Sequence, residues 1–131
     1  MNSKQLISIA VFCIYLAAVG FLCFAKPDDL PQVPTMWFGI PADKAGHFLM
    51  FIPFPILSYM VFGNPDSNRL RQMLKLSAIM CMGIGLAIGT EQIQAQLAYR
   101  QAEFMDLYAD AAGLVFGGLI TTALIIYRKK R

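Results

Sequence analysis

Four long apolar segments constrain the fold of this chain more than any other feature of its sequence. Each is long enough to cross a bilayer, which requires about 20 residues of helix. They predict membrane spans at about residues 5–25, 43–63, 73–96 and 105–127. We therefore predict an all-α integral membrane bundle of four transmembrane helices, forming one domain over residues 1–131.

The composition supports this class of protein. Hydrophobic residues make up 57% of the chain and charged residues only 15%, whereas a soluble domain carries about 25% charged residues. The net charge of +3 does not indicate a nucleic-acid partner, because most of the basic excess lies in the C-terminal sequence RKKR beside an apolar segment. The lipid bilayer is the partner we expect, and RKKR is interpreted as a topology anchor.

The distribution of positive charge predicts the orientation of the spans. One side collects eight basic residues: Lys4, Arg69, Arg71, Lys75, Arg128, Lys129, Lys130 and Arg131. The other side has three, Lys26, Lys44 and Arg100. Both termini are therefore expected in the cytoplasm. The proline-rich first loop, which contains Trp37, is expected to form a strap at the outer membrane surface.

Ionisable and amide residues at three span ends should meet in one outer layer, because successive spans alternate in direction. They are Asp43, Lys44 and His47 at the start of span two, Glu91 and Gln92 near the end of span three, Arg100 in the next loop, and Asp106 and Asp110 in span four. A charged acid inside a bilayer costs roughly 2.5–3.5 kcal/mol at the centre and less near the interface. Glu91 therefore needs a partner or a proton.

Helical periodicity predicts how these spans pack. In span four, one face contains Asp106, Asp110, Gly113 and Gly117. In span three, one face contains Cys81, Gly85, Gly89, Gln92 and Gln96, with Glu91 at its border. Because glycine permits close helix contact, we expect the two glycine pairs to meet. Gln92, Glu91 and Asp110 would then line a polar cleft that opens outward. Pro53 and Pro55 are expected to kink span two.

The same residues carry a resemblance to a known family. The pattern D-K-x-x-H-F-x-x-F at Asp43–Phe51 resembles the first signature of VanZ-like membrane proteins. The second signature, G-x-x-x-E-x-x-Q followed by R and D-x-x-x-N-x-x-G, is matched by Gly85 or Gly89, Glu91, Arg100, Asp106 and Gly113. Gln92 and Gln94 are both candidates for its glutamine, and Asp110 stands where the family usually has Asn.

This resemblance, over about residues 5–125, implies a small multi-span protein of the bacterial cell envelope, in the plasma membrane. The family's namesake is linked to low-level resistance to the glycopeptide teicoplanin. The resemblance implies a class of protein rather than a reaction, so it leaves open whether the chain is an enzyme.

Three functions fit the outer polar layer. In the first, the chain binds a lipid-linked envelope component or teicoplanin: Lys44, His47 and Arg100 hold a phosphate or carboxylate, and acids orient sugar or amide groups. In the second, it is a hydrolase or transferase on a lipid-linked substrate, with Glu91 and His47 in acid–base roles. In the third, it is a small proton-coupled transporter. Four spans would form only a thin transport pathway unless the chain forms a homodimer.

No cofactor is predicted. The chain has neither the zinc motif H-E-x-x-H nor the nucleophile motif G-x-S-x-G, which argues against the enzyme alternative. A hard divalent metal held by Glu91, Asp106 and Asp110 is the alternative.

Structural roles are also open for several of these residues. Asp43 would suit the first turn of its helix, where the helix dipole favours an acid, and Lys44 would suit the membrane interface. Arg100 would suit an ion pair with Asp106 that closes the third loop, and Asp110 would suit internal hydrogen bonding.

Overall fold

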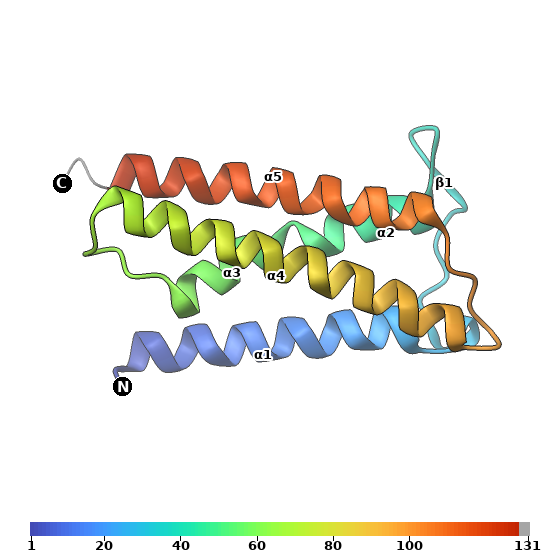
Figure 1. Ribbon diagram of the computed structural model, residues 1–131. Helices are drawn as coiled ribbons and strands as arrows, with labels where there is room; N and C mark the ends of the chain where they lie inside the picture. Colours follow the sequence, from blue (N-terminus) through green and yellow to red (C-terminus); the bar gives the residue numbers. More distant parts are fainter. Residues whose placement is uncertain (129–131) are drawn as a thin grey trace.

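The computed structural model describes residues 1–128 and shows four membrane-length helical units lying side by side (Figure 1). They are α1 (Ser3–Phe24), the pair α2 (Ala42–Phe51) and α3 (Pro53–Phe62), α4 (Arg69–Gln96) and α5 (Phe104–Arg128). Between α1 and α2 lie a short 3₁₀ helix, η1 (Pro27–Asp29), and a hairpin of β1 (Met36–Trp37) and β2 (Ile40–Pro41). All four units are long and apolar enough to cross a membrane, which confirms the predicted fold class.

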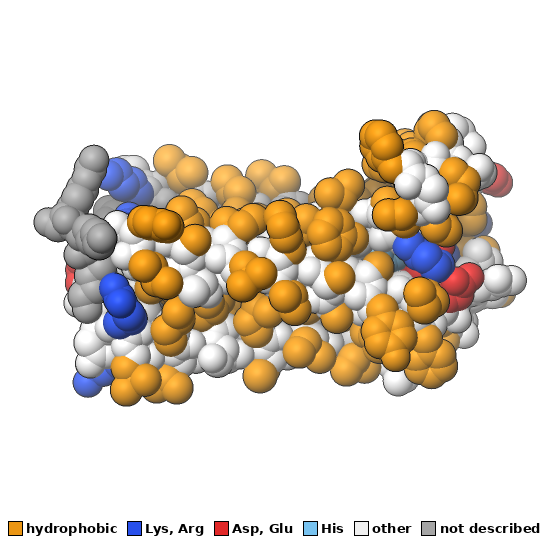
Figure 2. All heavy atoms as spheres, turned by 90° about the horizontal axis from the view of Figure 1, so that it is seen from above, with side chains coloured by type: hydrophobic (Ala, Val, Ile, Leu, Met, Phe, Trp, Pro, Cys, Tyr) orange, Lys and Arg blue, Asp and Glu red, His pale blue; other side chains and the backbone are white. Residues whose placement is uncertain are grey.

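The start of α1 and the end of α5 lie at the same end of the bundle, as expected for four alternating spans (Figure 1). Lys and Arg side chains gather at this end, and apolar side chains cover most of the length between the two ends (Figure 2). The side of the membrane that each end faces remains a prediction from the positive charges. Of the predicted RKKR anchor, only Arg128 is among the described residues; positions 129–131 lie outside them.

The second span is interrupted at the predicted place. Pro53 has no backbone N–H, and the helix divides at Ile52 into α2 and α3. Ile52 keeps helical dihedral angles (φ −57°, ψ −46°), so the backbone conformation stays helical through the interruption. Next to it, the hydroxyl of Tyr15 in α1 donates a hydrogen bond of 2.7 Å to the carbonyl oxygen of Met50. A neighbouring helix thus adds a hydrogen bond to a carbonyl about one turn before the proline.

The two glycine pairs do not meet, so the predicted helix packing is wrong. Gly113 and Gly117 of α5 lie against α2 and the start of α3, where an added Cβ would overlap the carbonyl oxygens of Phe48 and Ile52. Gly85 and Gly89 of α4 have open space at the corresponding positions. Because the broken second span occupies the glycine face of α5, α4 must use another face.

That other face of α4 consists of eight buried residues. They are Gln72, Leu76, Ile79, Gly83, Ala87, Thr90, Glu91 and Gln94. Gly83 approaches the side chains of Leu114 and Phe54, which belong to the buried apolar core between α3, α4 and α5. The consequence for the site is that Glu91 points into the bundle, whereas Gln92 is exposed.

The proline-rich loop forms the hairpin at the end opposite the termini (Figure 1). Its two-residue turn, Phe38–Gly39, has positive φ at both positions (51° and 79°), as in the turns that connect tight hairpins. Trp37, Phe38 and Ile40 are exposed there. An aromatic hairpin at this level suits the predicted strap at the membrane surface, because Trp favours the interface.

Candidate functional site

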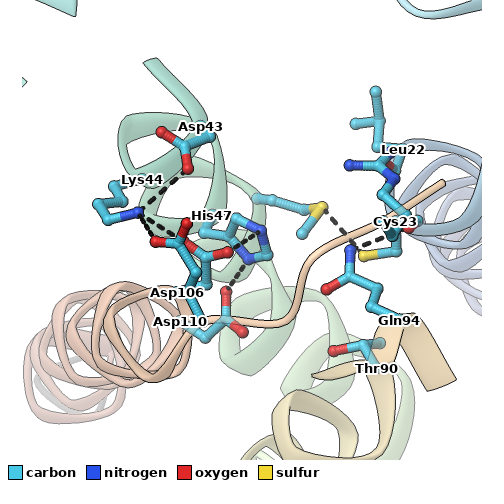
Figure 3. A network of polar contacts seen from close by, with 12 residues as sticks. Leu22, Cys23, Asp43, Lys44, His47, Thr90, Gln94, Asp106 and Asp110 are labelled. Atoms are coloured by element: carbon cyan, nitrogen blue, oxygen red, sulfur yellow. Dashed lines mark hydrogen bonds and ion pairs between the residues drawn. The ribbon is translucent and has the colours of Figure 1, made fainter. Parts of the chain in front are cut away.

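A buried histidine–aspartate pair forms the centre of the candidate site. His47 of α2 faces Asp110 of α5, and Nδ1 lies 2.7 Å from Oδ1 (Figure 3). Asp110 is fully buried and His47 is 9% exposed. In a neutral imidazole that faces an ionised Asp110, Nδ1 carries the hydrogen, because a carboxylate accepts hydrogen bonds, and Nε2 has the lone pair. Nε2 lies on the side of Asp106, 3.7 Å from Oδ2.

Lys44 ties the start of α2 to the start of α5. Its Nζ lies 2.7 Å from a carboxylate oxygen of Glu103 and 3.1 Å from oxygens of Asp43 and Asp106 (Figure 3). Asp43 and Glu103 are exposed, whereas Asp106 is buried. The buried aspartate therefore divides its two oxygens between Lys44 and the side that faces His47.

Glu91 reaches the same cluster from the third direction, α4. One ligand atom from each of His47, Glu91 and Asp106 lies within 4.8 Å of the other two. Glu91 is 9% exposed, yet neither of its carboxylate oxygens has a hydrogen-bond partner among the described residues. A buried polar group without a partner costs free energy, and a charged one costs more. This carboxylate is therefore free to bind a group that the chain itself does not supply.

A groove of about 250 Å³ runs between the end of α4 and the start of α5 and is lined by Glu91. Ile88, Phe104 and Leu107 supply much of its apolar lining, and Gln92 contributes a polar group. Asp110 is fully buried instead of lining the groove, so the opening differs from the predicted cleft. A larger hollow, about 510 Å³, lies at the end with the termini, away from the cluster.

The structure brings six of the eight predicted site residues together: Asp43, Lys44, His47, Glu91, Asp106 and Asp110. Gln92 lines the groove without joining this cluster. Arg100 lies elsewhere. Its Nη2 donates to the carbonyl oxygens of Leu22 (2.7 Å) and Ala25 (3.2 Å), at the end of α1. Asp106 pairs with Lys44, so the predicted ion pair with Arg100 is wrong.

Three polar residues outside the eight predicted site residues also have defined contacts. Glu103 forms an ion pair with Lys44. Its position three residues before Asp106 was the sequence signal that could have identified it. Gln94 is buried and donates through Nε2 to the carbonyl oxygen of Cys23 (2.9 Å), while the hydroxyl of Tyr99 donates to that of Phe24 (2.7 Å). Gln94, Tyr99 and Arg100 thus donate to the backbone carbonyls that the end of α1 leaves unpaired.

We expect Arg100→Met to destabilise the protein by about 1–2 kcal/mol, because two carbonyls at the end of α1 lose a charged donor. The loss should appear as a lower denaturation midpoint of the detergent-solubilised chain. Arg71→Met, which removes an exposed arginine from the start of α4, is the control and should leave the midpoint nearly unchanged. Equal midpoints for the two variants would contradict the capping role of Arg100.

The fold and the cluster define a class: a multi-pass helical membrane protein with a buried acid–histidine site at one end of its bundle. The profile of the family described as VanZ/LLP1 matches residues 9–126, and the chain belongs to this family. It is also similar to an uncharacterized protein of the fission yeast Schizosaccharomyces pombe, with 30% identity over 124 residues. The match covers 94% of this chain and 65% of the yeast protein, and no solved structure matches.

Proposed function

We propose that this protein binds the polar head group of a lipid-linked molecule that enters sideways from the bilayer, through the groove between α4 and α5. The observation that carries the proposal is Glu91, whose buried carboxylate lines the groove, belongs to the cluster and has no partner within the described chain. A head group that donates hydrogen bonds would remove the cost of leaving this carboxylate unpaired.

The chemistry of the surroundings defines the kind of ligand. Ile88, Phe104 and Leu107 offer an apolar surface suited to a hydrocarbon chain. Further inside, Glu91 and Asp106 accept hydrogen bonds from hydroxyl, amide or amine groups, as in sugars and peptides. An amphiphile with a long apolar tail and a polar head meets both requirements at once.

We further propose a setting for this activity, in the plasma membrane of a bacterium, with the cluster facing outward. The positive charges support that orientation, and the resemblance to the VanZ namesake supports a ligand from the cell envelope. Binding such a component would alter how teicoplanin meets the membrane.

The test is teicoplanin susceptibility of a sensitive bacterial host that expresses the wild-type chain, Glu91→Gln or Asp28→Asn at equal membrane levels. Asp28 is an exposed acid in η1 and serves as the matched control. We expect protection from the wild type and the control, and loss of protection with Glu91→Gln. In parallel, native mass spectrometry should detect a lipid retained by the wild type and depleted in Glu91→Gln. Protection and lipid retention by Glu91→Gln would refute the proposed site.

A second candidate function, hydrolysis or group transfer on the same lipid-linked molecule, is favoured by the orientation of His47. Asp110 binds Nδ1 and leaves Nε2 beside two carboxylates, an arrangement suited to general acid–base catalysis. Incubating the purified chain with a bacterial lipid extract separates the two functions. Catalysis predicts head-group products that disappear in Glu91→Gln while some lipid binding persists, whereas binding alone predicts no products.

A further inference from the structure

We infer that His47, Glu91 and Asp106 form a binding site for one divalent transition-metal cation. In this arrangement Nε2 of His47 and one oxygen from each carboxyl group are the protein ligands, and Asp110 orients the imidazole. The inference deepens the proposed function and rests on it in one respect: the cation would be the group that contacts the lipid's polar head.

The spacing of the three ligand atoms suits a single ion. Metal–ligand bonds to nitrogen and oxygen are about 2.0–2.2 Å for Zn²⁺, so two atoms bound to one ion lie at most about 4.4 Å apart. Nε2 of His47 and Oδ2 of Asp106 are 3.7 Å apart, too far for a direct hydrogen bond and well suited to an ion between them. One ligand atom from each of the three residues lies within 4.8 Å of the other two, so a small side-chain rotation would bring Glu91 within reach of the same ion.

Burial of Glu91 is the second, independent observation. Its side chain points into the bundle with 9% exposure, and both oxygens lack a hydrogen-bond partner in the described chain. The surroundings are rich in acids. Asp43, Glu103 and Asp106 share Lys44, and Asp110 is paired with His47. Among the described residues, Glu91 has no ion-pair partner of this kind, although it lies in the same cluster. A bound cation would supply the missing charge.

A second grouping, Asp43 with Glu103 and Asp106, has similar spacing but is not a cation site. The Nζ of Lys44 already lies between these three carboxylates at 2.7–3.1 Å. An additional cation there would meet the lysine charge, and Asp43 and Glu103 are exposed to solvent. Lys44 uses Oδ1 of Asp106 and leaves Oδ2 on the side of His47, which restricts the cation to the inner grouping.

The ligand types indicate which metal fits. Imidazole nitrogen favours transition metals, and carboxylate oxygens extend the choice to Mn²⁺, so Zn²⁺ and Mn²⁺ suit this mixed set better than Mg²⁺ or Ca²⁺. The hydrogen bond from Nδ1 of His47 to Asp110 has the form of the carboxylate–histidine pairs that orient metal-bound imidazoles. With three protein ligands, the ion would keep open positions for oxygens of a head group, including those of a phosphate.

The experiment is Mn²⁺ titration of the purified, tag-free chain in detergent, followed by electron paramagnetic resonance. We expect about one bound Mn²⁺ per chain and, for Glu91→Gln, affinity lower by at least roughly tenfold. Glu103→Gln is the matched control because it removes an acid from the outer grouping alone; its affinity should stay close to that of the wild type. Because His47 is the only histidine in the sequence, imidazole nitrogen coupling in the wild-type spectrum identifies its ligand without any substitution.

The inference is overturned if the wild type binds no Mn²⁺ at millimolar concentration, or if bound Mn²⁺ shows no imidazole coupling. It is also overturned if Glu103→Gln loses the ion while folded Glu91→Gln keeps it. If Glu91→Gln fails to fold, the coupling in the wild-type spectrum still decides the outcome. The titration uses the metal alone, so an absence of Mn²⁺ binding would contradict the metal site without affecting lipid retention. Failure of the proposed lipid-binding function would instead appear as an absence of retained lipid in native mass spectrometry.

Discussion

Replacing Gly117 by alanine is expected to destabilise the folded bundle by about 1–3 kcal/mol, because the added methyl group meets the backbone of the second span. A Cβ at this position would overlap the carbonyl oxygen of Ile52 and lie 3.1 Å from a ring carbon of Pro55. Neither atom belongs to the flexible end of a side chain, so the helices must separate. Gly113→Ala should behave similarly, since its Cβ would overlap the carbonyl oxygen of Phe48.

Gly85→Ala and Gly89→Ala are the matched controls on α4. No atom lies within 4 Å of the Cβ position at either residue, and alanine is the better helix former by about 1 kcal/mol in soluble hosts. Both controls should therefore be neutral or stabilising. The measurement is the midpoint of unfolding on titrating mixed micelles with sodium dodecyl sulfate. A Gly85→Ala loss as large as that of Gly117→Ala would mean that the glycine face of α4 is a packing surface after all.

Lys44→Met is expected to lower the free energy of unfolding by about 3 kcal/mol, the low end of the range for breaking a buried ion pair. The main reason is Asp106, which is 5% exposed and would lose its partner at 3.1 Å. Asp43 and Glu103 are exposed, so they would regain water and contribute little. The measurement is the same unfolding titration, carried out with a metal chelator so that a bound ion does not compensate.

Lys26→Met is the control for this variant, because Lys26 is an exposed lysine at the same end of the bundle. The double variant Lys44→Met/Asp106→Asn should recover part of the loss, since it removes the buried charge that the first substitution leaves unpaired. The ion pair between Lys44 and Asp106 is contradicted if Lys44→Met lowers the free energy of unfolding no more than Lys26→Met does. It is also contradicted if adding Asp106→Asn to Lys44→Met lowers this free energy by as much as Asp106→Asn does in the wild type.

The order of polar residues along the chain was sufficient to predict most of the cluster. Spans must alternate in direction, so Lys44, Glu91 and Asp106 belong to one end of the bundle whatever the packing of the helices. The i, i+4 spacing of Asp106 and Asp110 likewise places both on one face of α5. In the structure His47 contacts this face and belongs to the same group as Glu91, a pairing that the sequence reasoning did not specify.

Helix partners were not predictable in the same way. Two glycine-bearing faces, at Gly85 and Gly113, have the same small-residue character, and periodicity alone does not distinguish them. The choice depends on which surface fits the broken second span, whose backbone comes close to Gly113 and Gly117. That choice rotates α4 so that Gln94 is buried and Gln92 is exposed. Arg100 was misassigned for a related reason: its partners are backbone carbonyls of α1, which no side-chain pattern reveals.

The sequence by itself determined the four spans, their alternating direction and the end of the bundle at which the acids and the histidine lie. These properties follow from the length of each apolar segment and from chain direction. The three-dimensional packing determined which oxygen faces which nitrogen: Asp110 faces Nδ1 of His47, and Asp106 lies on the Nε2 side. It also left Glu91 without a hydrogen-bond partner among the described residues. Such pairings depend on the rotation of each helix about its own axis, and contacts between side chains distant in the sequence set that rotation.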